Sequence, residues 1–243
     1  MITAAAVCPA PPLLARELTG ADPVAPDLRQ ACLEATRALL ATGPALVAVV
    51  GVAGESRAFD PRGRADLAAY APALARQQDG RDGPPARPAG EPLPLSLGLG
   101  SRLLDEAGYA GRRELRSVSE QTPAADCAAL GARLAGRAAR VGLLVMADGS
   151  ARRGLRAPGY LDERSAPFDA GVERAVRDGD MAALLALDPA LASELMATGR
   201  AAWQVLAGAM SGSRPVGEIR YSGHPFGVAY LVAVLTAAAD GST

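Results

Sequence analysis

Three short apolar segments without polar alternation constrain the fold of this 243-residue chain more than any other feature. They cover residues 2–7, 45–50 and 141–147, and each is followed within two residues by a proline or glycine. A strand that is apolar at every position is typically buried on both faces, as in a sheet that is covered on both sides. The chain is therefore expected to form an α/β fold with a central, mostly parallel or mixed sheet and helices on both faces.

Helical periodicity occupies much of the sequence between and after these segments. Helices are expected over residues 22–42, 100–107 and 123–140, with Thr122 as N-cap of the last helix and Pro123 at its first position. Residues 165–210 are expected to be helical, with breaks at 178–179, 188–189 and 199. Further strands are expected at 93–97, at 114–118 as an edge strand, and at 214–221 and 226–235 around a hairpin-like connection.

One segment lacks any period and is rich in Gly, Pro and polar residues. It spans residues 76–92 and is expected to be a flexible surface loop, with a lid over a site as the alternative. No stretch is long enough to act as a linker between two folded units. The chain, residues 1–243, is therefore expected to form a single domain.

Composition excludes several kinds of chemistry. All 25 basic side chains are arginine, so a lysine Schiff base or a phosphate-loop lysine is impossible. His224 is the only histidine, which excludes a metal site built from two or three imidazoles. The sequence has 54 alanines but only three Phe, one Trp and five Tyr, so we expect closely packed elements in place of aromatic bulk.

The charge pattern and the cysteines limit partners and location. A net charge of −1 with scattered arginines argues against nucleic-acid binding. The start of the chain has no basic region and reaches prolines at once, so it does not resemble a signal peptide, and no window has the roughly 18 apolar residues of a membrane helix. Three cysteines, an odd number, favour reduced thiols, so we expect a cytoplasmic protein without membrane contact.

Three polar clusters follow predicted strands, where ligands usually sit in open α/β sheets. Cys8 begins a rigid run of prolines and is either a reactive thiol or a small buried side chain. Asp148 and Ser150 serve either in acid/base work and binding or as a plain turn. His224 is either a general base, with Ser150 or Ser222 as nucleophile, or a surface residue.

No phosphate loop, paired-cysteine zinc pattern or serine-hydrolase elbow accompanies these clusters. The candidate catalytic residues are Cys8, Asp148, Ser150 and His224. The expected ligand pocket consists of Cys8, Ala10, Pro11, Glu55, Asp148, Ser150, Tyr221, His224 and Phe226, with no metal ligand among them.

Five segments, taken in order, resemble the superfamily of class III extradiol ring-cleavage dioxygenases. They are AAAVCPAPPLL (4–14), VVGVAG (49–54), LLVMADGSA (143–151), APFDAGV (166–172) and HPFGVAYLVA (224–233). The resemblance spans most of the chain. It implies an α/β sandwich with ferrous iron held by two histidines and one glutamate at the strand ends, and a further histidine as acid/base.

This sequence departs from that pattern at the residues that matter for catalysis. The first histidine ligand falls on Ala10, the second near Ala53 or Gly54, and the acid/base histidine on Ala151. Two acidic residues, Glu194 and Glu218, match no motif that would identify the glutamate ligand. Because methyl groups and glycine cannot coordinate iron, we expect the fold without the iron cofactor or the ring-cleavage activity.

Three functions are compatible with these residues. In the first, the chain has lost its iron site and acts as a small-molecule-binding or partner subunit, with a homo-oligomer expected. In the second, a metal-independent enzyme reuses the cleft through Cys8, Asp148, Ser150, Tyr221 and His224. In the third, the domain is purely structural and its cleft is filled by Ala and Leu side chains.

Overall fold

A seven-stranded sheet forms the centre of the computed structural model, which describes residues 1–19, 24–67, 70 and 91–237. The strand order is β3-β6-β2-β7-β1-β9-β8. Neighbours among β6, β2, β7 and β1 run parallel, whereas β3, β9 and β8 pair antiparallel. The strands are β1 (Ile2–Cys8), β2 (Leu46–Val52), β3 (Ala58–Phe59), β6 (Arg113–Val118), β7 (Val141–Met146), β8 (Pro215–Gly223) and β9 (Tyr230–Ala237).

The central strands are apolar throughout because each of their faces packs against helices. In β7, Leu143 and Val145 point into one hydrophobic core, and Leu144 and Met146 point into the other. All four side chains are buried. The pattern that predicted a sheet covered on both sides is thus explained by two separate cores, and the expected mixed α/β fold is confirmed.

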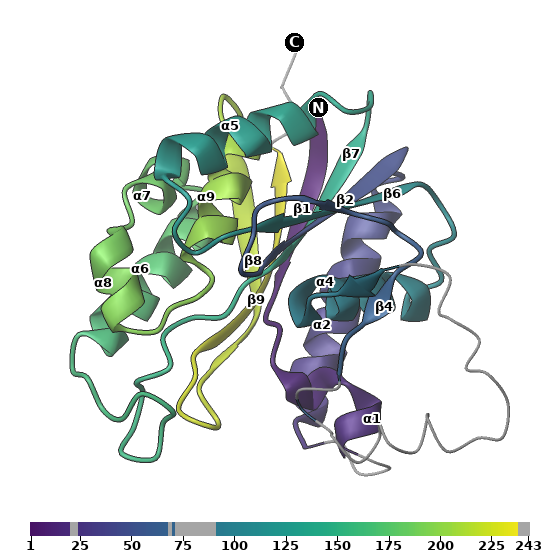
Figure 1. Ribbon diagram of the computed structural model, residues 1–243. Helices are drawn as coiled ribbons and strands as arrows, with labels where there is room; N and C mark the ends of the chain where they lie inside the picture. The colour runs from purple at the N-terminus through teal and green to yellow at the C-terminus, as the bar shows by residue number, and fades with distance from the viewer. Residues whose placement is uncertain (20–23, 68–69, 71–90, 238–243) are drawn as a thin grey trace, which may run out of the picture.

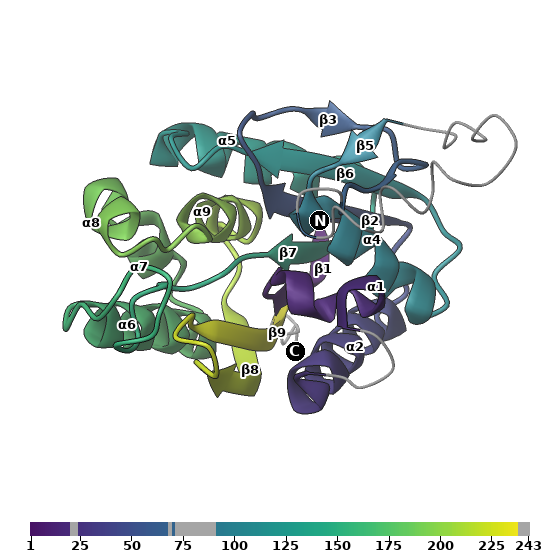
Figure 2. The same cartoon turned by 60° about the horizontal axis from the view of Figure 1, so that its bottom comes forward.

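The helices form two layers, which Figure 1 and Figure 2 show on opposite sides of the sheet. The first layer contains η1 (Pro12–Leu14), α1 (Arg16–Thr19), α2 (Pro26–Ala41) and α4 (Leu95–Glu106). The second layer contains α5 (Ala124–Ala135), α6 (Ser165–Asp178), α7 (Met181–Leu185), α8 (Pro189–Glu194) and α9 (Arg200–Ala209). No helix in the described ranges has both the length and the apolarity needed to cross a membrane.

Several predicted boundaries are wrong, most clearly around residue 95. The expected strand at 93–97 is reduced to β5 (Pro92–Leu93), which pairs with β4 (Arg64–Ala65), and α4 begins at Leu95. A short apolar run fits a buried helix as well as a strand, so periodicity could not distinguish them. The strand expected at the sheet edge, β6, is covered by β3, where Phe59 pairs with Leu115.

Other predicted elements differ mainly at their ends. Pro123 is the N-cap of α5, in place of Thr122, and the helix ends at Ala135. The breaks in the region 165–210 are confirmed. The β8–β9 connection lies at 224–229, later than expected. Of the predicted loop 76–92, residues 76–90 lie outside the described residues, while Glu91 forms an ion pair with Arg57 and Pro92 belongs to β5.

Candidate functional site

The carboxyl ends of β1 and β7 bring two of the sequence clusters together. Cys8 pairs with Met146 in the parallel ladder, and the Ala147 N–H donates to the Cys8 carbonyl oxygen at 2.8 Å. Asp148 then lies beside the turn after β1, where its Oδ1 accepts a hydrogen bond of 2.9 Å from the Ala10 N–H. The register of two buried strands therefore places the carboxylate against the proline-rich turn.

Asp148 is an unusual carboxyl group because burial dominates its electrostatics. Burial raises its pKa from 3.8 to about 6, and the hydrogen bond from Ala10 opposes that rise only partly. Burial also raises the pKa of the Tyr230 hydroxyl, and the nearby charge of Asp148 raises it further. A carboxyl group that titrates near neutral pH is common at functional sites.

Two thiols lie close to this carboxyl group. Cys8 is fully buried, and its thiol donates to the backbone carbonyl of Cys32 on α2 at an Sγ–O distance of 3.9 Å. The hydrogen bond between the two thiols and burial raise the pKa of Cys32 well above its ordinary value, and the charge of Asp148 adds to this rise. The Cys32 thiol is therefore protonated, and all three cysteines, including Cys127, are free.

Asp169 on α6 fixes the turn that follows β7. Its Oδ1 accepts the Ser150 N–H at 2.9 Å, and its Oδ2 accepts the Ser150 hydroxyl at 2.6 Å and Arg153 Nη1 at 3.0 Å. Ser150 is fully buried. The Asp-Gly-Ser sequence thus forms an irregular segment held by a distant carboxylate, and the Ser150 hydroxyl donates a hydrogen bond to that carboxylate.

A cavity of about 340 Å³ opens beside this turn, between α6, α9 and the β8–β9 hairpin. Trp203 lines it, has 1 % of its surface exposed, and has an indole N–H that donates to no acceptor in the described structure. The lining residues are Gly149, Arg153, Ala166, Asp169, Ala170, Val172, Glu173, Trp203, Ser222, Gly223, His224, Ala229, Tyr230 and Leu231.

Glu173 provides the second carboxylate of the cavity. Its Oε2 accepts a hydrogen bond of 2.6 Å from the Ser222 hydroxyl, and its Oε1 pairs with Arg177 one helical turn further along α6. The Ser222 hydrogen bond, followed by the Arg177 guanidinium, holds the pKa of Glu173 below its ordinary value. Glu173 is therefore ionised at neutral pH and already has two donors.

The structure separates several residues that the sequence grouped into one pocket. Of the nine predicted pocket residues only His224 lines the cavity; Cys8, Ala10, Pro11, Asp148 and Ser150 do not. Phe226 does not line the cavity, and its side chain is 45 % exposed. Tyr221 packs against the hydrophobic core on the α2 side. His224 is exposed at the cavity and has no hydrogen bond to Ser150 or Ser222 among the described residues.

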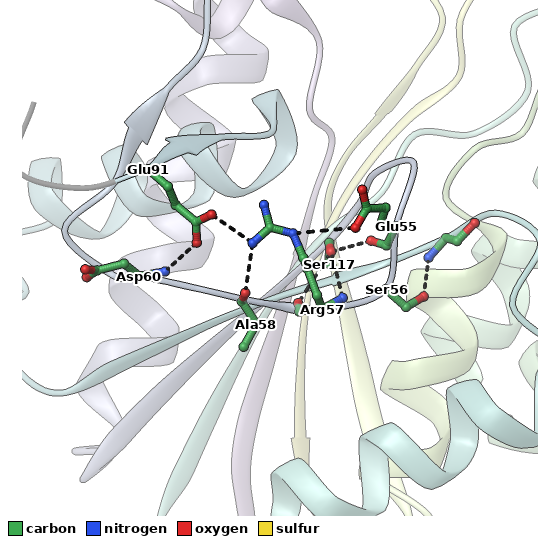
Figure 3. Close-up of polar contacts among 8 residues, drawn as sticks. Glu55, Ser56, Arg57, Ala58, Asp60, Glu91 and Ser117 are labelled. Atoms are coloured by element: carbon green, nitrogen blue, oxygen red, sulfur yellow. Dashed lines mark hydrogen bonds and ion pairs between the residues drawn. The ribbon is translucent and has the colours of Figure 1, made fainter.

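Glu55 lies at another depression, which is lined by residues 53–55 and neighbours from β3 and β5. Figure 3 shows how the backbone there is held: the Ser117 hydroxyl donates to the Glu55 carbonyl oxygen and accepts the Arg57 N–H. The Arg57 guanidinium contacts Glu91 at 2.8 Å. This segment therefore forms a separate surface next to β2, away from the cavity lining.

The positions that the resemblance assigns to iron chemistry hold no donor side chains. Ala10 and Ala151 are nearly buried, at 9 % and 8 % exposure, and Ala53 provides only a methyl group. Across the described residues, no three His, Cys, Asp or Glu side chains are placed to hold a metal ion together. The side chains at this edge of the sheet therefore do not fit a ferrous centre.

Sequence reasoning missed three residues of the candidate site: Asp169, Glu173 and Trp203. All three lie on helices at positions that suit an amphipathic helix, and only the docking of α6 and α9 brings them to the cavity. The APFDAGV segment, one of the segments that carry the family resemblance, includes Asp169 and was the one feature of the sequence that pointed to this residue.

Comparison with known proteins supports the fold only. No protein-family profile matches the chain, and no curated protein matches it in sequence. Its structure is similar to the crystal structure of uncharacterized protein JW3007 from Escherichia coli K12, with a TM-score of 0.56 and 16 % sequence identity. The similarity covers 96 % of this chain and 99 % of that chain.

Proposed function

We propose that this chain is a small-molecule-binding protein with an extradiol-dioxygenase-like fold that has lost iron-dependent ring cleavage. The observation that carries the proposal is the cavity beside the turn after β7. It combines an arginine, a histidine, two carboxylates and a tryptophan indole at the edge of the sheet where ligands usually bind in α/β folds. Its volume of about 340 Å³ suits a small organic molecule.

The loss of iron chemistry rests on the available donors. Ala10, Ala53 or Gly54, and Ala151 replace the side chains that the resemblance would require, and His224 is the only imidazole in the sequence. The one unusual carboxyl group nearby, Asp148, accepts a hydrogen bond from a backbone N–H, and its charge raises the pKa of Cys32 and of Tyr230. We therefore expect protein purified without chelators to contain substoichiometric iron.

A metal-independent enzyme is the second candidate, favoured by the raised pKa of Asp148 next to Cys8 and Cys32. An acid that titrates at about pH 6 suits general acid/base catalysis. Asp148, Cys8 and Ser150 do not line the cavity, however, and the Ser150 hydroxyl is bound to Asp169. Binding without chemistry therefore explains more of the observed geometry.

Blocking the cavity should abolish binding without unfolding the protein. Trp203 is the only tryptophan, so its fluorescence can report ligands from a library of small organic acids, amides and amines. Ala170 lies on α6, is exposed and lines the cavity. The larger side chain in Ala170→Leu would occupy part of the space that a ligand needs. We expect it to weaken binding of any hit by about tenfold or more, because overpacking costs about 1–3 kcal/mol.

Ala129→Leu is the matched control, because Ala129 is equally exposed on helix α5 but does not line the cavity. It should leave both the affinity and the melting temperature close to those of the parent protein. The proposal is wrong if no compound changes Trp203 emission, or if Ala170→Leu binds each hit as tightly as the control. Stoichiometric iron bound by protein side chains would also contradict it.

A further inference from the structure

We infer that the cavity binds a small organic acid, with its carboxylate accepting from Arg153 and from the Trp203 indole N–H and its apolar part against the apolar side chains of the wall. This inference rests on the proposed function, because it names the ligand of the same cavity. It follows from an imbalance between hydrogen-bond donors and acceptors in the described wall.

Both carboxylates of the wall already accept hydrogen bonds from the protein. Asp169 accepts three hydrogen bonds, two from Ser150 and one from Arg153. Glu173 accepts one bond on each oxygen, from Ser222 and Arg177. Asp169 pairs with Arg153 and Glu173 pairs with Arg177, so each negative charge of the wall has a cationic partner.

Two strong donors of the wall are largely unused. The indole N–H of Trp203 is buried and has no acceptor among the described residues. Arg153 uses only Nη1 in a side-chain hydrogen bond, and its side chain is partly exposed at 21 %. The other N–H groups of this guanidinium can therefore reach a ligand. A ligand that completes this wall must supply acceptors, because a buried donor without a partner costs free energy.

Two features favour a carboxylate with an apolar body over a fully polar anion. A guanidinium with free N–H groups binds a carboxylate through two parallel hydrogen bonds, which a neutral carbonyl cannot match. The rest of the wall is apolar, with Val172, Leu231 and Ala170 beside the indole. The ligand class is therefore an amphipathic monocarboxylate that fits about 340 Å³.

Three probes with the same apolar chain test this assignment: hexanoate, hexanamide and hexylammonium. Labelling with [¹⁵N]tryptophan gives one indole N–H resonance, because Trp203 is the only tryptophan. We expect hexanoate to shift this resonance downfield in a saturable way and to bind at least about tenfold more tightly than hexanamide. Hexylammonium should leave the resonance unchanged at the same ionic strength.

Arg153→Gln should weaken hexanoate binding by about tenfold or more while leaving hexanamide binding nearly unchanged. Arg156→Gln is the matched control, because Arg156 is exposed on the same loop and does not line the cavity. Arg153→Lys keeps the charge without the planar guanidinium and should give an intermediate loss. The comparison of the three probes on the parent protein needs no variant, so it holds even if Arg153→Gln misfolds.

Tighter binding of hexanamide or hexylammonium than of hexanoate would overturn the inference. The inference would also be overturned if none of the three probes shifts the indole resonance, while other compounds still change Trp203 emission and are blocked by Ala170→Leu. In either case the proposed binding function survives. If no compound of any class reaches Trp203, both the inference and the proposed function fail.

Discussion

Asp148→Asn should raise the free energy of unfolding at pH 7 by about 3 kcal/mol, because it removes a buried carboxylate that the fold penalises. The pKa of Asp148 rises from 3.8 to about 6 on folding, mainly through burial. Asparagine is nearly isosteric and keeps an oxygen that can accept the Ala10 N–H, so the turn after β1 stays in place. The expected gain corresponds to the removed ionisation penalty.

The pH dependence gives this prediction its sign. Well below pH 3.8 the carboxyl group is protonated in both states and contributes no pH dependence. Between about pH 4 and 6 the unfolded chain ionises while the folded protein keeps its proton, so the stability of the parent protein falls as pH rises. Above the folded pKa the loss is complete. Asp148→Asn should therefore exceed the parent only slightly at pH 4 and by the full amount well above pH 6.

Urea unfolding at a series of pH values measures this difference. Asp178→Asn is a suitable control, because Asp178 is exposed at the end of α6, and this variant should stay within about 0.5 kcal/mol of the parent at every pH. A constant difference between Asp148→Asn and the parent from pH 4 to pH 8 would contradict the assignment. A carboxyl group that costs stability at neutral pH is retained more readily where it serves a function.

The proximity of Asp148 to Ala10 illustrates what the sequence alone could predict. Parallel buried strands end at the same edge of a sheet, so apolar runs followed by Cys8 and by Asp148 predicted that the two turns would meet. The identity of the buried strands was predictable for the same reason, because burial on both faces removes polar alternation. These inferences need only local pattern and the geometry of a parallel pair.

The cavity could not be predicted in this way. Asp169 and Trp203 lie on α6 and α9, where their spacing is equally compatible with a solvent-facing and a core position. Their convergence depends on how two helices dock on the sheet, which is a tertiary effect. The same limit explains Glu55, which the sequence grouped with the strand-end residues but which the β2–β3 segment carries to another surface.

The contact between α5 and α9 leads to the second large prediction. The helices approach so closely that a Cβ on Gly208 would lie 2.2 Å from the carbonyl oxygen of Ala128, and a Cβ on Gly131 would lie 2.1 Å from that of Val205. Both obstacles are backbone atoms, which cannot move without shifting a helix. We expect Gly208→Ala to lower the free energy of unfolding by about 3 kcal/mol, the upper part of the usual range for overpacking.

Gly171→Ala separates this packing effect from helix propensity. Gly171 lies within α6, and a Cβ there would come no closer than 4.0 Å to the mobile end of Arg174. The same substitution should therefore stabilise the protein by about 0.5–1 kcal/mol, because alanine favours a helix over glycine. Chemical denaturation of the two variants should give opposite signs, and equal signs would show that the α5–α9 contact is looser than the structure indicates.

The Gly208 substitution also has a consequence for the cavity. Gly208 and Trp203 belong to the same short helix, so a displacement of α9 that relieves the contact with Ala128 also moves the indole. Trp203 emission should change in Gly208→Ala even before unfolding, whereas Gly171→Ala should leave it unaltered. If Trp203 emission stays constant while the free energy of unfolding falls, α5 shifts and α9 stays in place. The α5–α9 contact then does not affect the position of the cavity wall. The glycine at position 208 would then affect the stability of the fold and not the cavity.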